Sequence, residues 1–253
     1  MWLCPMQQVN FPQEAGMPTI VLDNVSKFYK NDGHLEAAVR DVDLTVNQGE
    51  FVFIVGSSGS GKSTVLQLMS GEIKPNRGKV YLNDQEVQKL KRWKRSELAL
   101  LIGRVWQEPT LMRKRTVGEN LRVAAMVGAV KRRDSHMDVQ ERVEKVLGIV
   151  GMQGTQNLYP VELSDGEVRR VELARAIINS PPILILDEIT ANLDEDNIWD
   201  IFHILMDINR RGTTVIMATH ASQFVNIMYR RVVTMVDGRV FGDVERGKYG
   251  DIV

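Results

Sequence analysis

The sequence is poor in the features that mark secreted or membrane-spanning proteins. Cys4 is the only cysteine among 253 residues, so no disulfide can form within the chain, and a reducing compartment fits. No apolar run approaches the ~18 residues that a membrane-spanning helix needs. Residues 1–16 also lack the basic start and apolar centre of a secretion signal. The sequence therefore predicts a soluble protein unless a partner holds it at a membrane.

The chain also lacks an excess of either charge. Lys and Arg together number 32, as do Asp and Glu, so the formal net charge is zero and no nucleic-acid partner is expected. The length predicts one large domain or two lobes. Residues 17–20 lead directly into a strand-like segment, so either Met17 is the natural start or residues 1–16 are a disordered N-terminal extension.

A complete phosphate-binding pattern is what the chain does contain. Residues 56–63 match G-x-x-x-x-G-K-[ST] and directly follow the apolar run 51–55. Glycines let the backbone wrap around phosphates, and the helix that follows adds its positive N-terminal end. Lys62 is expected to reach the β- and γ-phosphates, and Ser63 to ligate Mg²⁺. The predicted nucleotide-binding residues here are Gly56, Ser57, Ser58, Gly59, Ser60, Gly61, Lys62, Ser63 and Thr64.

An acidic pair follows a second apolar run. Residues 183–186 are apolar without alternation, which is typical of a parallel strand buried on both faces. Asp187 and Glu188 come next, at the strand end where α/β sheets bind ligands. Asp187 is predicted to hold Mg²⁺, and Glu188 to act as general base on an attacking water.

A helix start lies just upstream of this strand. Ser164 and Glu167 have the spacing of a capping box, so a helix is expected to begin there. The pattern allows two interpretations: an ordinary capped helix, or a second phosphate-binding helix terminus.

The order of these motifs resembles that of the ATP-binding-cassette ATPases. Residues 163–167, Leu-Ser-Asp-Gly-Glu, are similar to the signature Leu-Ser-Gly-Gly-Gln/Glu of that family, and the resemblance covers residues 20 to about 241. It implies an α/β P-loop NTPase fold with a RecA-like core, an antiparallel β subdomain and an inserted helical subdomain. The implied boundaries are 17–89 and 166–241 for the core with its β subdomain, 90–165 for the helical insertion, and 242–253 for a C-terminal tail.

The resemblance also implies roles for individual residues. Gln107 matches the Q-loop glutamine, which contacts Mg²⁺ and senses a membrane partner. His220 matches the switch histidine at the γ-phosphate, and Tyr29 matches the aromatic residue that stacks on adenine. The implied catalytic residues are Glu188, His220, Gln107 and Lys62, and the implied metal ligands are Ser63, Gln107 and Asp187. Further nucleotide contacts are implied for Ser164, Gly166, Glu167 and Asp194.

Two such cassettes are expected to form an ATP-dependent head-to-tail homodimer. Each ATP would lie between the phosphate loop of one copy and the signature helix of the other, so ATP and Mg²⁺ are the implied cofactors. Four residues depart from the family pattern and together suggest slow or partner-dependent hydrolysis: Asp165, Ile189, Ala191 and Ala221.

Three further segments bear on the biological role. Residues 111–117, 215–220 and 240–250 resemble cassettes that act in bacterial cell division, although lipoprotein-release and macrolide-exporter ATPases share much of this pattern. The resemblance implies an integral membrane partner docking near Glu108–Val117, and hence a position on the cytoplasmic face of the cell membrane. Leu111 and Met112 are either anchors for that partner or packing residues of the helical lobe. A transport ATPase and a soluble cassette protein remain the alternatives.

Overall fold

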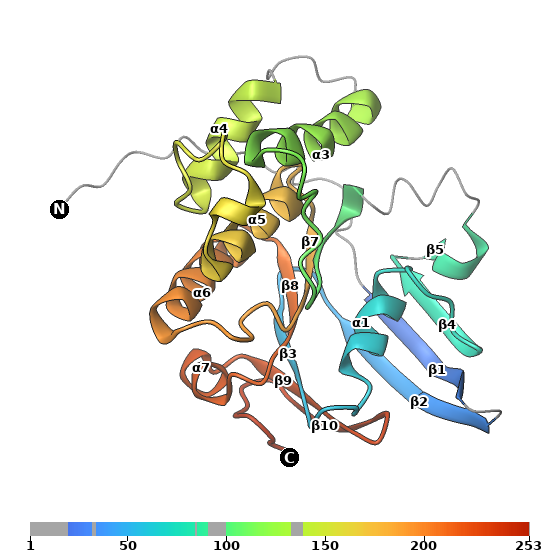
Figure 1. Cartoon of the computed structure of the whole chain (residues 1–253). Helices are drawn as coiled ribbons and strands as arrows, with labels where there is room; N and C mark the ends of the chain where they lie inside the picture. The colour runs from blue at the N-terminus through green and yellow to red at the C-terminus, as the bar shows by residue number, and fades with distance from the viewer. Residues whose placement is uncertain (1–19, 32–33, 84, 91–99, 133–138, 253) are drawn as a thin grey trace.

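The computed structural model describes residues 20–31, 34–83, 85–90, 100–132 and 139–252. The expected extension 1–16 lies outside these ranges. Two β-sheets and a layer of helices make up the described chain (Figure 1). The six-stranded sheet has the order β10-β9-β3-β8-β7-β6. Its strands are β3 (Phe51–Val55), β6 (Ile102–Val105), β7 (Ile183–Asp187), β8 (Thr214–Ala218), β9 (Arg231–Val236) and β10 (Arg239–Val244).

Strand direction divides this sheet into two parts. Every neighbouring pair from β9 through β3, β8 and β7 to β6 is parallel, whereas β10 pairs antiparallel with β9 as the second strand of a hairpin. The carboxyl ends of the parallel strands therefore meet at one edge, where ligands bind in such sheets. Strand β10 continues to Val244, three residues beyond the expected end of the core at 241.

The second sheet is antiparallel throughout. It has the order β2-β1-β4-β5 and consists of β1 (Ile20–Asn31), β2 (His34–Val46), β4 (Arg77–Leu82) and β5 (Gln85–Glu86). Strand β2 alternates buried Val42, Leu44 and Val46 with exposed neighbours, as a sheet with one covered face requires. A short 3₁₀ turn, η1 (Val87–Lys89), follows strand β5.

Helix α1 (Lys62–Met69) lies between the two sheets (Figure 1). Its buried Val65, Leu66, Leu68 and Met69 join one hydrophobic cluster with residues of both sheets. Val52 and Ile54 of β3 face that cluster, whereas Phe51, Phe53 and Val55 face a second cluster on the opposite side of the sheet. Strand β3 is thus buried on both faces, which explains its unbroken apolar sequence.

Helices cover that opposite face. The helices against the sheet are α5 (Asp165–Ile177), α6 (Glu195–Arg210) and α7 (Ser222–Met228), with the 3₁₀ turn η2 (Pro160–Glu162) before α5, whereas α3 (Val117–Arg132) and α4 (Val139–Ile149) pack on α5. Helices α3 and α4 form a separate lobe above the sheet (Figure 1). The predicted fold, a P-loop core with an antiparallel β subdomain and an inserted helical subdomain, is confirmed. Among the described helices, none is both long and apolar enough to span a bilayer.

Candidate active site

The phosphate loop connects the end of β3 to the start of α1. Gly56 has φ 147° and Gly61 has φ 98°, a region of backbone conformation that favours glycine. A Cβ at Gly56 would lie 2.3 Å from the carbonyl oxygen of Met235, and one at Gly61 would lie 2.4 Å from that of Ala38. Both glycines are therefore required by close contacts with neighbouring backbone as well as by their own conformation.

Lys62 is the charged centre of this loop. Its side chain is only 4% exposed, and its Nζ donates hydrogen bonds of 3.0 Å to the carbonyl oxygens of Gly56 and Ser57. The same Nζ lies 3.7 Å from Oε1 of Glu188. The lysine is thus fixed where a phosphate bound by the loop would meet its charge.

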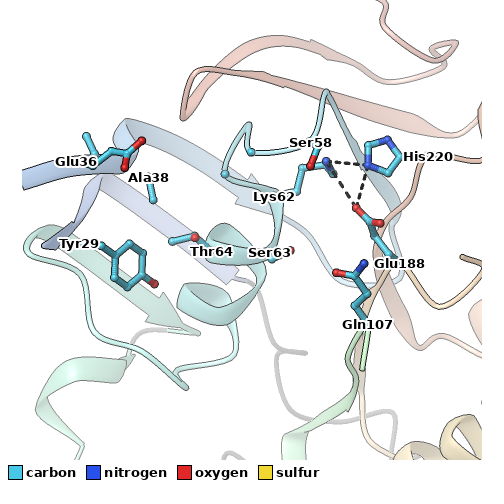
Figure 2. Close-up of a pocket in the computed structure, with 13 residues that line it drawn as sticks. Tyr29, Glu36, Ala38, Ser58, Lys62, Ser63, Thr64, Gln107, Glu188 and His220 are labelled. Atoms are coloured by element: carbon cyan, nitrogen blue, oxygen red, sulfur yellow. Dashed lines mark hydrogen bonds and ion pairs between the residues drawn. The ribbon is translucent and has the colours of Figure 1, made fainter. Parts of the chain in front are cut away.

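A pocket of about 420 Å³ opens beside the loop. Figure 2 shows side chains from the loop, from β1 and β2, and from the ends of β6, β7 and β8 around it. This volume is in the range of sites for small ligands. The predicted site residues that line it are Tyr29, Ser58, Gly59, Gly61, Lys62, Ser63, Thr64, Gln107, Glu188 and His220, and the others are Glu36, Ala37 and Ala38.

Glu188 is turned into this pocket by an unusual backbone conformation. Its φ is 48°, in the left-handed region that residues other than glycine rarely adopt and that is enriched at functional sites. Its Oε1 lies 3.0 Å from Nε2 of His220, which itself lies 3.4 Å from Nζ of Lys62 (Figure 2). A carboxylate, an imidazole and an ammonium group therefore converge on one side of the pocket.

Asp187 precedes this cluster and has the environment of a cation ligand. It is 4% exposed, and burial raises the pKa of its carboxyl group, against a hydrogen bond from Ser63 that lowers the pKa. Its Oδ1 is buried with no hydrogen-bond partner among the described residues. Carboxylate and hydroxyl oxygens are the ligands that Mg²⁺ prefers, so the residues present fit that ion.

The remaining predicted contacts lie elsewhere on the chain. Asp194 caps α6 by accepting a 2.8 Å hydrogen bond from the backbone N–H of Asn197. Asn197 also contacts Gly166, where an added Cβ would lie 2.3 Å from its Oδ1. Ser164, Gly166, Glu167 and Asp194 thus belong to a second group of residues, at the starts of α5 and α6, and do not line the pocket.

Comparison with known proteins identifies this arrangement. A family model described as "ABC transporter" matches residues 39–191, which include the phosphate loop and the acidic pair. The chain belongs to the ABC transporter family.

The relatives of the cassette differ in their described roles. It is 41% identical over 234 residues to the cell division ATP-binding protein FtsE of Streptococcus pneumoniae, covering 92% of this chain and 99% of that protein. It is 36% identical to the methionine import ATP-binding protein MetN 2 of Bacillus cereus, covering 92% of this chain and 67% of that protein. A dimeric ATP-binding cassette solved in a post-hydrolysis state with ADP and phosphate superposes with a TM-score of 0.82 at 30% identity, covering 91% and 100% of the two chains.

Helix α5 of the cassette holds the segment that carries Gln107. Arg169 donates to the carbonyl oxygens of Trp106 and Gln107, and it pairs with fully buried Glu172 at 2.9 Å. Glu172 accepts a 2.7 Å hydrogen bond from the backbone N–H of Thr110, whose carbonyl oxygen accepts one from Arg175. One face of α5 therefore fixes the backbone around Gln107.

Sequence reasoning missed several of these functional positions. Arg169 and Glu172 contact residues about 60 positions away, and no local pattern reveals such a pairing. Tyr249 of the C-terminal tail reaches the active site, where its hydroxyl lies 3.3 Å from Nδ1 of His220.

The two apolar residues that the sequence offered as anchors for a partner differ in exposure. Leu111 is buried in the helical lobe and so packs internally, whereas Met112 is 38% exposed.

Proposed function

We propose that the cassette binds Mg-ATP and hydrolyses it to ADP and phosphate. The observation that carries this proposal is the convergence of Lys62, Glu188 and His220 on one side of the phosphate-loop pocket. These are the groups that phosphoryl transfer to water requires: a cation for the phosphates, a base for the water, and a polar group at the transferred phosphoryl.

The hydrolytic step follows from this placement. The water oxygen forms a bond to the γ-phosphorus as the bond to the β,γ-bridging oxygen breaks, and ADP leaves with that electron pair. Glu188 accepts the proton of the water, while Lys62 and the loop N–H groups stabilise the negative charge on the phosphate oxygens. His220, 3.0 Å from the Glu188 carboxylate, holds that base and would face the γ-phosphate of a bound nucleotide.

Ser63, Asp187 and Gln107 are the residues that would hold Mg²⁺ in this site. Ser63 and Gln107 both line the pocket, and Ser63 is hydrogen-bonded to the buried Asp187 behind it. When bound, Mg²⁺ neutralises charge on the β- and γ-phosphates. A buried Oδ1 that has no hydrogen-bond partner within the described part of the chain supports this assignment for Asp187.

We further propose an ATP-dependent head-to-tail homodimer. Ser164, Gly166, Glu167 and Asp194 lie outside the pocket of their own chain, so a second copy could bring them to the nucleotide. The relative solved with ADP and phosphate is itself dimeric, which supports this assembly.

The Glu188→Gln variant tests the proposed hydrolysis. An amide cannot accept the proton of the water, so turnover should fall about 10²- to 10⁴-fold. ATP affinity should stay near that of the unmodified chain, because the loop and Lys62 are intact. Glu144→Gln, at an exposed position of α4, is the matched control and should leave both quantities unchanged. Near-normal turnover of Glu188→Gln would remove Glu188 from the role of base.

For the biological output, we propose that the cassette is the FtsE-like partner of an FtsX-like integral membrane protein. In this role ATP binding and hydrolysis would activate peptidoglycan hydrolases during cell division, from the cytoplasmic face of the membrane. Identity of 41% to a protein named FtsE, over nearly the full length of both chains, supports this role. The exposed part of Glu108–Val117, which includes Met112, is the proposed docking segment.

A second candidate function is the ATPase subunit of a transporter. The 36% identity to MetN 2 favours an importer, and lipoprotein-release or macrolide-exporter complexes are the other forms of this alternative. Affinity purification of the Glu188→Gln chain from native membranes with Mg-ATP distinguishes the two. Recovery of an FtsX-like protein with wall hydrolases supports division, whereas recovery of a permease with a substrate-binding or export component supports transport.

A further inference from the structure

The C-terminal segment after β10 folds back onto the ATP site. The backbone N–H of Tyr249 donates a 2.7 Å hydrogen bond to Oδ1 of Asn226 in α7, and that of Gly247 donates to the carbonyl oxygen of Arg230 at 3.1 Å. The hydroxyl of Thr234 in β9 donates to the carbonyl oxygen of Asp251 at 2.7 Å. Three contacts with α7, β9 and the turn between them therefore fix the segment on both sides of Tyr249.

This anchoring places the Tyr249 hydroxyl between two parts of the site. It lies 3.3 Å from Nδ1 of His220 at the end of β8, and the backbone of Gly56 in the phosphate loop is near enough to influence its pKa. Burial raises the pKa of the Tyr249 phenol, and the neighbouring backbone of Gly56 opposes that rise. The phenol thus keeps its proton at neutral pH and can donate it in a hydrogen bond.

The groups around the imidazole indicate the tautomer of His220. Oε1 of Glu188 lies 3.0 Å from Nε2 and can only accept, so Nε2 carries a proton and Nδ1 is left to accept from the Tyr249 O–H at 3.3 Å. Nζ of Lys62 lies 3.4 Å from Nε2, but it donates to the carbonyl oxygens of Gly56 and Ser57 and has Oε1 of Glu188 at 3.7 Å for its third proton. The opposite tautomer would turn a lone pair toward a carboxylate.

We propose that Tyr249 is a positioning residue for the reaction, which fixes His220 as the Nε2–H tautomer and links the C-terminal segment to the ATP site. This inference rests on the proposed ATPase function, since the Nε2–H group is what His220 presents to Glu188 and to the γ-phosphate. Tyr249 does not line the nucleotide pocket, so its effect acts through His220.

The Tyr249→Phe variant tests the proposal because it removes only the hydroxyl. Loss of one neutral hydrogen bond should lower kcat about three- to tenfold, while KM for ATP stays within twofold. The spectroscopic readout is the ¹⁵N NMR signal of His220 in the full chain, assigned with His220→Gln. The Nε2–H form should dominate in the unmodified protein and lose that dominance in Tyr249→Phe.

The matched control is Tyr229→Phe, which removes a hydroxyl from a tyrosine that is 51% exposed at the end of α7. Retained ATP affinity and an unchanged melting temperature show that each variant is folded. A His220 tautomer that is identical in Tyr249→Phe and Tyr229→Phe, with equal kcat, would overturn the proposal. The NMR measurement needs no turnover, so a tautomer that depends on Tyr249 in a chain without ATPase activity would overturn only the proposed function.

Discussion

The two helix N-termini that the motifs place near phosphate are built in opposite ways. Helix α1 begins after Gly61, which offers no side-chain cap among the described residues, and its first turn contains no acidic residue. Helix α5 begins with a capping box in which Glu167 Oε2 accepts hydrogen bonds of 2.8 and 2.9 Å from the backbone N–H and hydroxyl of Ser164. In the part of the chain that the structure describes, the start of α1 thus has no side-chain cap, whereas side chains at the start of α5 accept from the N–H groups of Ser164 and Glu167.

The two helix starts also differ in the sign of their charged side chains, which are basic in α1 and acidic in α5. Lys62, buried at the start of α1, adds a positive charge to the positive end of the helix dipole. The first turn of α5 carries Asp165 and Glu167, both of which stabilise the helix but repel a phosphate. The start of α1 can therefore bind an anion within a single chain. In the proposed homodimer, α5 would meet the nucleotide bound by the second copy with this capping box already formed.

The largest expected effect in this comparison is a loss of ATP affinity when the start of α1 is changed. Lys62→Ala removes a charged hydrogen-bond donor from the phosphate site, and ATP affinity should fall about 10- to 100-fold. Isothermal titration calorimetry on the full chain measures this. Lys89→Ala is the control, because Lys89 is 74% exposed and pairs with Glu86 outside the pocket. Affinity within twofold of the unmodified chain would show that α1 is not the principal phosphate site.

The comparison also separates what the sequence could predict from what it could not. The phosphate loop, the buried strand before Asp187 and the capping box of Ser164 and Glu167 are local patterns, because backbone geometry over a few residues demands particular side chains. The α1 and α5 helix starts were therefore predictable, as was the fold that these motifs imply.

Contacts that join distant segments were not predictable in this way. The bond between Tyr249 and His220 depends on how the chain returns after β10, and the pairing of Arg169 with the backbone at Trp106 spans 63 residues. The left-handed conformation of Glu188 was equally hidden, because its sequence neighbours give no glycine or turn signal. Each of these features is set by tertiary packing and not by local propensity.

A smaller effect is expected at the cap of α5. Ser164→Ala removes the hydroxyl that accepts from the N–H of Glu167, so the free energy of unfolding should fall by about 1 kcal/mol. The matched change is Ser58→Ala in the phosphate loop, an exposed serine that caps no helix, and it should alter stability by less than about 0.5 kcal/mol. Urea denaturation of both variants gives the two values. Equal losses would mean that the termini do not differ in capping.

The smallest effect concerns the charge of the α5 cap. Hydrogen bonds from the backbone and hydroxyl of Ser164 lower the pKa of Glu167 below its ordinary value of 4.5. A group whose pKa is lower in the folded state stabilises the fold above its unfolded pKa and loses that contribution as the pH falls through the folded pKa. Glu167→Gln should therefore cost a few tenths of a kcal/mol at pH 7, consistent with a surface charge at a helix N-terminus.

Below the depressed pKa of Glu167 this cost should vanish, because the carboxyl group of the unmodified chain is then neutral as well. Urea denaturation at pH 7, 5, 4 and 3 follows the difference between the two proteins, with Glu144→Gln as a control from the exposed face of α4. A difference that does not change with pH would mean that Glu167 acts on α5 through shape alone. The acidic charge would then add nothing to the contrast with α1, and the repulsion of phosphate at α5 would have to come from Asp165.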